Sequence, residues 1–200
     1  MPLPAPSIRS LLLALAVAAP MAATAQEPTL QDWGFDPSVL VADTSELLRR
    51  APDPAVDGLF QAVHAAAKAP REAQVLCALF DPDADRSLSG LNGAAARLSP
   101  ASQERFALAV AEVLVAATQN PPQSFDPATA RQAMKSAGAT AAILHEDFLP
   151  GMAAGAGADA RCHSFGLLLD ALQTRPLAER AAVTRLLLLE GLARVGTTTG

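Results

Sequence analysis

Apolar residues recur three and four positions apart over most of residues 44–195, the spacing of a helix face that packs into a core. Short breaks separate these stretches, and most breaks carry a proline directly after an Asp or a Ser, as at Asp53-Pro54, Ser99-Pro100 and Asp126-Pro127. The side-chain oxygen can accept hydrogen bonds from the free amides of a first helical turn, and proline is tolerated at the first helical position. The pattern predicts helices over residues 44–50, 54–68, 71–80, 87–97, 100–118, 127–146, 159–173 and 177–195.

No stretch alternates apolar and polar residues between turn residues, so no strands are expected. The predicted fold class is all-α, with one domain over residues 43–196 built as a bundle of about seven to eight helices. Residues 26–42, which contain the single tryptophan, are expected to be irregular. Residues 150–157, rich in Gly and Ala, are expected to be a flexible connector, and residues 197–200 a disordered tail.

The helix over residues 100–118 is expected to be the central one, because Glu112 is its only charge between Phe106 and Ala117. In the last helix, Arg185 lies in the middle of an apolar sector. A buried charge needs a partner, and Glu112 is the strongest candidate, so we predict a structural ion pair between Glu112 and Arg185. The alternative is that Arg185 extends to solvent at the helix edge and Glu112 faces a shallow surface.

Residues 1–25 have the pattern of a secretory signal peptide. Arg9 precedes an apolar run over residues 11–19, and small residues at 23–25 form a cleavage site after Ala25. A run of this length is shorter than the roughly 20 residues that cross a bilayer. We therefore expect a periplasmic or secreted protein that begins at Gln26 and is not an integral membrane protein. The alternative is an uncleaved tether.

The composition narrows the classes of partner. The chain has 20 Asp and Glu against 15 Lys and Arg, a formal net charge of −5, and loss of Arg9 with the signal peptide makes it more negative. Mild acidity without a basic cluster argues against binding to nucleic acid or to an anionic membrane surface. One Trp, seven Phe and no Tyr make a carbohydrate or peptide groove less favoured.

The two cysteines, Cys77 and Cys162, are expected to form a disulfide. Each lies on the apolar face of its predicted helix, and an exported protein meets an oxidising compartment. A crosslink that closes a loop of about 85 residues stabilises a fold by about 4–5 kcal/mol in the chain-entropy account. Two buried free thiols are the alternative.

Residues 81–92 resemble the calcium loop of EF-hand proteins over these 12 positions, with oxygen-bearing side chains at loop positions 1, 3, 5 and 9. Arg86 stands where the family has a turn-forming glycine, and Asn92 where a bidentate Glu closes the site. The alternative is another Asp-Pro helix start. We expect no tight calcium binding and no cofactor; the weak candidate ligands are Asp81, Asp83, Asp85, Ser87 and Ser89.

No catalytic constellation is found. The three histidines lack a metal-binding spacing, and Ser164 lies in no nucleophile elbow. The function expected is therefore a binding or protein-interaction module of the cell envelope whose partner, a protein or envelope component, the sequence does not identify. The alternatives are a cell-envelope hydrolase that uses a Glu/Asp pair and, third, a calcium-stabilised structural protein.

Overall fold

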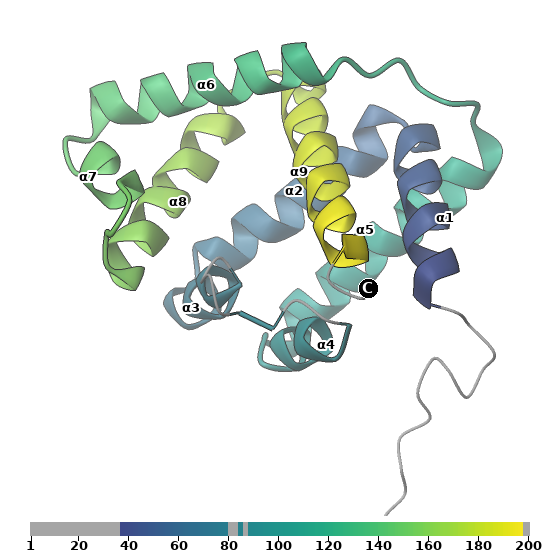
Figure 1. Ribbon diagram of the computed structural model, residues 1–200, viewed down its shortest axis with the longest axis horizontal. Coiled ribbons are helices and arrows are strands. Elements are labelled where there is room, and N and C mark those ends of the chain that lie inside the picture. Colours follow the sequence, from purple (N-terminus) through teal and green to yellow (C-terminus); the bar gives the residue numbers. More distant parts are fainter. Residues whose placement is uncertain (1–36, 80–83, 86–87, 198–200) are drawn as a thin grey trace, which may run out of the picture. The chain divides into compact units, whose positions relative to one another are not determined.

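The computed structural model of the chain describes residues 37–79, 84–85 and 88–197 (Figure 1). Within this part the secondary structure is entirely helical, so the all-α prediction is confirmed. The helices are α1 (Pro37–Arg50), α2 (Asp53–Ala67), α3 (Pro70–Ala78), α4 (Leu88–Ala96), α5 (Pro100–Gln119), α6 (Pro127–Leu144), α7 (Phe148–Met152), α8 (Ala158–Gln173) and α9 (Leu177–Thr197). In the described residues, no helix is long and apolar enough to cross a membrane.

The proline breaks predicted the helix starts well, and two starts have the expected side-chain cap. Ser99 accepts a hydrogen bond from the amide of Ser102, and Asp126 accepts from the amides of Ala128 and Thr129. Asp53 does not cap α2, because it already lies inside the first turn. The signal peptide and residues 26–36 lie outside the described residues.

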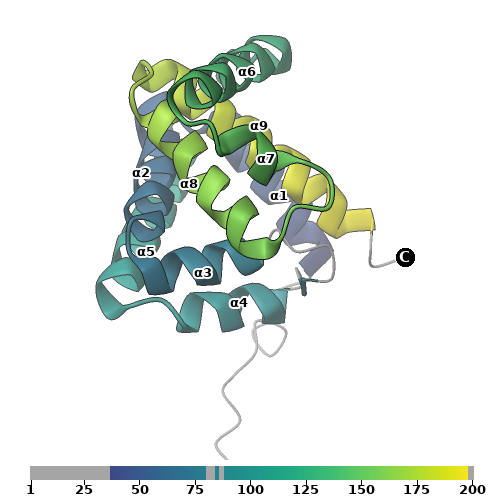
Figure 2. The ribbon, with the colours of Figure 1, turned by 90° about the vertical axis from the view of Figure 1, so that its left-hand side faces the viewer.

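The central helix is α2 and not α5, so the prediction for residues 100–118 is wrong in this respect. Helix α2 packs against α3, α5, α8 and α9, whereas α5 packs mainly against α2 and α1 (Figures 1 and 2). Small residues let α2 be approached from several sides, and Ala55, Ala62 and Ala66 are all buried. Helix α5 therefore covers one side of α2 and has a face of its own that the described helices leave open.

Two clusters of buried apolar side chains form the core, one on each side of the α2–α9 contact. The first joins α2, α6, α7, α8 and α9 around Phe60, Phe148 and Leu172. The second joins α1, α2, α5 and α9 around Leu48 and Val56. Helices α2 and α9 contribute to both clusters and so join the N-terminal and C-terminal halves of the chain.

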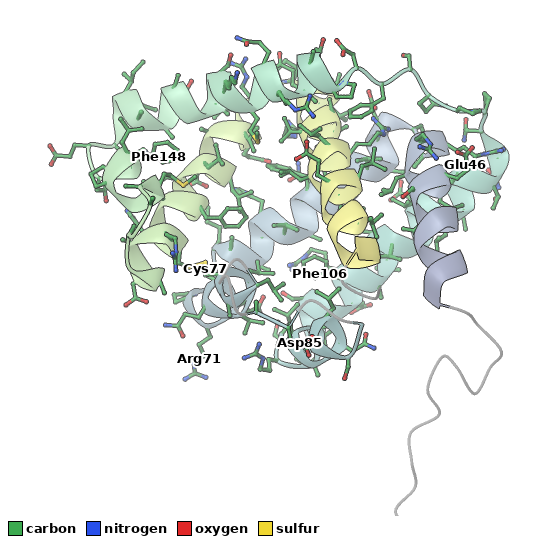
Figure 3. The ribbon with its side chains drawn as sticks, in the orientation of Figure 1. Glu46, Arg71, Cys77, Asp85, Phe106 and Phe148 are labelled. Carbon is green, nitrogen blue, oxygen red and sulfur yellow. A yellow bond between two sulfur atoms is a disulfide. The ribbon has the colours of Figure 1, made fainter. Side chains whose placement is uncertain are left out.

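The disulfide between Cys77 and Cys162 is present, as predicted. It joins α3 to α8 with 5.2 Å between the two Cα atoms and closes a sequence separation of 85 residues. Figure 3 shows Cys77 on α3, with the sulfur atoms in yellow. The crosslink fixes α3, which has few other contacts, to the first core cluster through α8.

Arg185 is buried, but its partner is Asp53 and not Glu112. Only 1% of its side chain is exposed, and its Nη1 donates to Asp53 Oδ1 at 3.0 Å. Its Nε and Nη2 donate to the carbonyl oxygens of Leu48 at 3.0 Å and Ala51 at 2.7 Å. A helix end leaves its last carbonyls without partners in the helix. Arg185 therefore closes the C-terminus of α1 and the turn into α2, while Glu112 is exposed on α5.

Two segments expected to be irregular contain helices. Helix α1 begins at Pro37, inside the range 26–42, and α7 takes up Pro150 to Met152. Gly151 is buried because α7 approaches α8 closely there: a Cβ at this position would lie 2.1 Å from Ser164 Oγ. Ser164 in turn donates to the carbonyl of Phe148 at 3.0 Å. This glycine provides close packing and not a flexible connector.

Candidate interaction surface

Helix α5 is fixed at both ends by side chains from neighbouring helices. At its start, Glu72 of α3 accepts a hydrogen bond from Ser102 Oγ at 2.6 Å and one from the Ser99 amide at 3.2 Å. The hydrogen bond from the Ser102 hydroxyl, followed by that from the Ser99 side chain, lowers the pKa of the Glu72 carboxyl below its ordinary value. At its end, Arg50 Nε donates to the carbonyl of Ala117 at 3.0 Å. The helix is therefore held in place without contacts on its outer side from the other described helices.

The inner face of α5 carries small side chains that pack against α2 and α1. Ser102, Ala109, Val113 and Ala117 are buried, at spacings of seven, four and four residues. The opposite face is also apolar, with the spacing of a second helical stripe. We call this stripe the outer face of α5; its members are exposed and comprise Ala107, Leu108, Ala111, Leu114 and Val115.

The exposure of this face is unusual for large apolar side chains. Leu108 is 63% exposed, Val115 is 56% and Leu114 is 44%. Single exposed apolar residues are normal on a protein surface. A contiguous stripe of them along two turns of one helix is instead typical of a surface that contacts another protein.

Charged residues lie along one flank of the outer face and at its N-terminal end, where Glu104 is exposed nearly in line with Ala111. Arg105 and Glu112 are exposed and, at 100° per residue, lie within about 20° of each other around the helix. Arg105 Nη1 also donates a long hydrogen bond of 3.4 Å to Ser102 Oγ in its own helix. The other flank carries Val110, which is 46% exposed. The surface thus has an apolar centre, one charged flank and one apolar flank.

A second group of exposed apolar side chains lies where α6 meets α7. Ile143 is 83% exposed, and Leu144, Leu149 and Met152 are exposed as well. These residues are spread over the end of α6 and the five-residue helix α7, on either side of the turn between them, and so form no continuous stripe. The outer face of α5 is the better-formed surface.

The calcium candidates fall largely outside the described residues. Asp81, Asp83 and Ser87 are not described, Asp85 is exposed, and Ser89 lies in the first turn of α4. Within the described ranges, no three His, Cys, Asp or Glu side chains gather as metal ligands would. The absence of tight calcium binding stays a prediction, to be checked by thermal unfolding in calcium against chelator.

Two of the three histidines, His64 and His163, are partners of carboxylates. His64 Nε2 lies 2.9 Å from Asp170 Oδ1, and Lys68 Nζ donates to Asp170 Oδ2 at 2.6 Å. Burial alone would raise the pKa of Asp170, but the hydrogen bonds from Lys68 and His64 outweigh it, so this pKa lies below its ordinary value. On the surface, His163 Nε2 lies 2.8 Å from Asp147 Oδ2.

Two cavities contain carboxylates. One of about 410 Å³ lies beside the disulfide and contains Asp159. The other, of about 360 Å³, contains Asp53 and Asp126. A glycosidase-type acid needs a raised carboxyl pKa. Asp53 is instead paired with Arg185, and the hydrogen bond from the Thr129 hydroxyl, followed by those from the backbone, lowers the pKa of Asp126.

Sequence reasoning placed the residues of the outer face in the core. Residues 106–117 are apolar on two sides of the helix. Such a helix can be covered on both sides by the rest of its own chain, or one of its apolar sides can be exposed to solvent. Helix α2, which other helices cover on several sides, carries a charge that is buried and paired. Its Asp57 accepts two hydrogen bonds from Arg180 of α9, at 2.7 and 2.8 Å. The most enclosed helix is thus the one whose charge is neutralised by a neighbour.

Comparisons of the chain with protein-family models, with curated proteins and with solved structures gave no match. The function is therefore argued from the geometry of this surface.

Proposed function

We propose that this protein is an exported protein-interaction module of the cell envelope and that the outer face of α5 is its contact surface. The observation that carries the proposal is the exposed stripe around Leu108 and Val115 on a helix whose ends are held by other helices. A surface of this kind binds by burying apolar side chains in a partner, because each buried side chain contributes about 1.5–3 kcal/mol.

Export is supported by two features of the chain. The first is the signal-peptide pattern over residues 1–25, with cleavage expected after Ala25. The second is the disulfide, since such bonds persist in oxidising compartments and are rare in reducing ones. N-terminal analysis of the protein from the cell envelope should start at Gln26; a mature protein that still carries residues 1–25 would contradict cleavage.

The contact surface can be tested in intact cells of the organism that makes the protein. A photoreactive amino acid replaces Ala111, in the middle of the outer face, and a matched protein carries it at Gln132, an exposed position of α6. The proposal expects a protein cross-link from position 111 that is stronger than the one from position 132. The cross-link should be lost when Leu108→Glu and Leu114→Glu are added, because two charges in the stripe oppose burial.

The fold of each variant is checked by its far-ultraviolet circular dichroism and its melting temperature. A position 111 that cross-links no more than position 132, in protein that is folded, would overturn the proposed contact surface. Cross-linking that persists unchanged with both glutamates present would also overturn it, because the apolar stripe would then not be the binding element.

A further inference from the structure

We propose that the partner on the outer face of α5 is a second copy of this chain, paired antiparallel along the same helix. This inference rests on the proposed function and names the occupant of that surface. It is carried by the order of charged, small and large side chains over residues 105–114 of α5, which matches its own reverse. A two-fold axis is the commonest symmetry of soluble oligomers, and it requires such a self-complementary surface.

The apolar positions define a coiled-coil frame. Leu108 and Val115 lie seven residues apart, with Ala111 between them at a spacing of three and four. Leu108 and Val115 thus take the a positions of a heptad and Ala111 the d position. In an antiparallel pair, an a residue of one helix packs at the level of a d residue of the other. With the two-fold axis between residues 109 and 110, Leu108 of each copy lies against Ala111 of the other.

The flanking positions then complement each other on both sides. On the apolar flank, Ala107 and Leu114 occupy g positions and face each other across the pair, a small residue against a large one. On the charged flank, Arg105 and Glu112 occupy e positions, and each Arg105 faces Glu112 of the other copy. The same axis brings opposite charges together twice on the charged flank. At each end of the seam it places Val115 opposite Glu104, the d residue one heptad before Ala111.

The exposed fractions agree with this arrangement. The inner face of α5 is already used by α2 and α1, whereas Leu108, Leu114 and the charged flank are exposed. Alanine at positions 107 and 111 lets two helices approach closely, which favours packing of the larger side chains around them. The described helices that pack on α5 leave Leu108, Ala111 and Leu114 exposed.

The charged flank distinguishes specific antiparallel pairing from non-specific association of apolar surfaces, because only the specific pair depends on Arg105 and Glu112. The mature chain and its variants are compared by sedimentation equilibrium at about 0.1–1 mM, a range suited to an interface below the standard size. The parent chain is expected to form a dimer. Arg105→Glu alone and Glu112→Arg alone are expected to weaken it, because each variant brings like charges together twice.

Two restorations are expected. The double variant with Arg105→Glu and Glu112→Arg should dimerise as the parent chain does, since the charges have only exchanged places. An equimolar mixture of the two single variants should form a one-to-one dimer, because each supplies the charge that the other lacks. Circular dichroism and melting temperature establish that each variant is folded, and Lys135→Glu, a charge reversal at an exposed position of α6, serves as a control outside α5. A dimer that is equally stable in the parent chain, in both single variants and in the double variant would overturn the antiparallel pairing.

Failure of the pairing and failure of the contact surface can be told apart. A chain that stays monomeric while position 111 cross-links to a different protein in cells would overturn self-pairing and leave the proposed function standing. A monomeric chain whose position 111 cross-links to nothing would overturn both. A dimer that is lost with Leu108→Glu and restored by neither charge exchange nor mixing would overturn the pairing geometry.

Discussion

Replacement of Arg185 by methionine tests how the N-terminal helices are fixed to α9. Methionine keeps most of the length of the buried stem but removes every donor. The carbonyls of Leu48 and Ala51 then lose charge-assisted hydrogen bonds of 3.0 and 2.7 Å. These carbonyls lie where α1 ends and the chain turns into α2, so no helical partner can replace the guanidinium.

The expected cost follows from these contacts. Each hydrogen bond from a charged donor contributes about 1.5–3 kcal/mol. The pair with Asp53 adds little, because the Asp53 side chain is 40% exposed and water can solvate it. The guanidinium also lies 5.8 Å from the centre of the Phe125 ring, which adds about 0.5–1 kcal/mol. Apolar contacts of methionine offset part of this, so Arg185→Met should lower the free energy of unfolding by about 3–5 kcal/mol.

Urea unfolding followed by circular dichroism measures this change, and for a domain of this size the melting temperature should fall by about 6–20 °C. Arg131→Met is the matched control, because Arg131 also pairs with a carboxylate but is 54% exposed. The control should change stability by less than about 1 kcal/mol. If Arg185→Met costs no more than Arg131→Met, the reasoning about the buried carbonyls is wrong.

Three further predictions follow from contacts elsewhere in the fold. Reduction of the disulfide, or Cys77→Ser with Cys162→Ser, should lower the melting temperature, because the crosslink stabilises the fold by about 4–5 kcal/mol through the entropy of the unfolded chain. Labelling of two thiols in unreduced, unfolded protein would refute the bond itself. The pKa of Glu72 is lowered from 4.5 by its hydrogen bonds, so its contribution is present above pH 4.5 and is lost as the pH falls through the folded-state value. Glu72→Gln should therefore flatten the loss of stability in acid, and an unchanged acid slope would contradict this role. Gly151→Ala should destabilise α7, because the added methyl group meets Ser164 Oγ and a backbone carbonyl; a melting temperature equal to that of the parent chain would show that α7 can move aside at no cost.

Local chemistry along the chain predicted most of the helices. Ser99-Pro100 and Asp126-Pro127 act where they were expected to act, because a cap and a proline need only the residues next to them. The disulfide was predictable for a similar reason. Cys77 and Cys162 lie on the apolar faces of their helices, and the spacing of apolar residues within one helix is enough to identify that face. Fold class and crosslink thus follow from signals contained within single helices.

The partners of charged residues were not predictable in this way. Arg185 was expected to need a carboxylate, and the sequence offered Glu112 as the lone charge of an apolar helix. Two of the three groups to which it donates hydrogen bonds are backbone carbonyls, which every residue carries and no side-chain pattern marks. The third, Asp53, was assigned to a helix cap. The central helix was predicted wrongly for a related reason. The apolar face of a helix does not show which other element packs on it, or whether any does.

The question of what covers the outer face can be settled within α5 by two adjacent residues. Val113 points inward and is 6% exposed, whereas Leu114 points outward and is 44% exposed. Val113→Ala removes two buried methyl groups and should cost about 2 kcal/mol at any protein concentration. In dilute solution, Leu114→Ala should cost less than about 0.5 kcal/mol, because half of that side chain is already in water and alanine favours the helix. At concentrations at which the chain pairs, the same variant should lower the melting temperature relative to the parent chain, since stability then includes association. Equal costs for the two variants in dilute solution would mean that this chain covers its own outer face, and would contradict both the contact surface and the pairing.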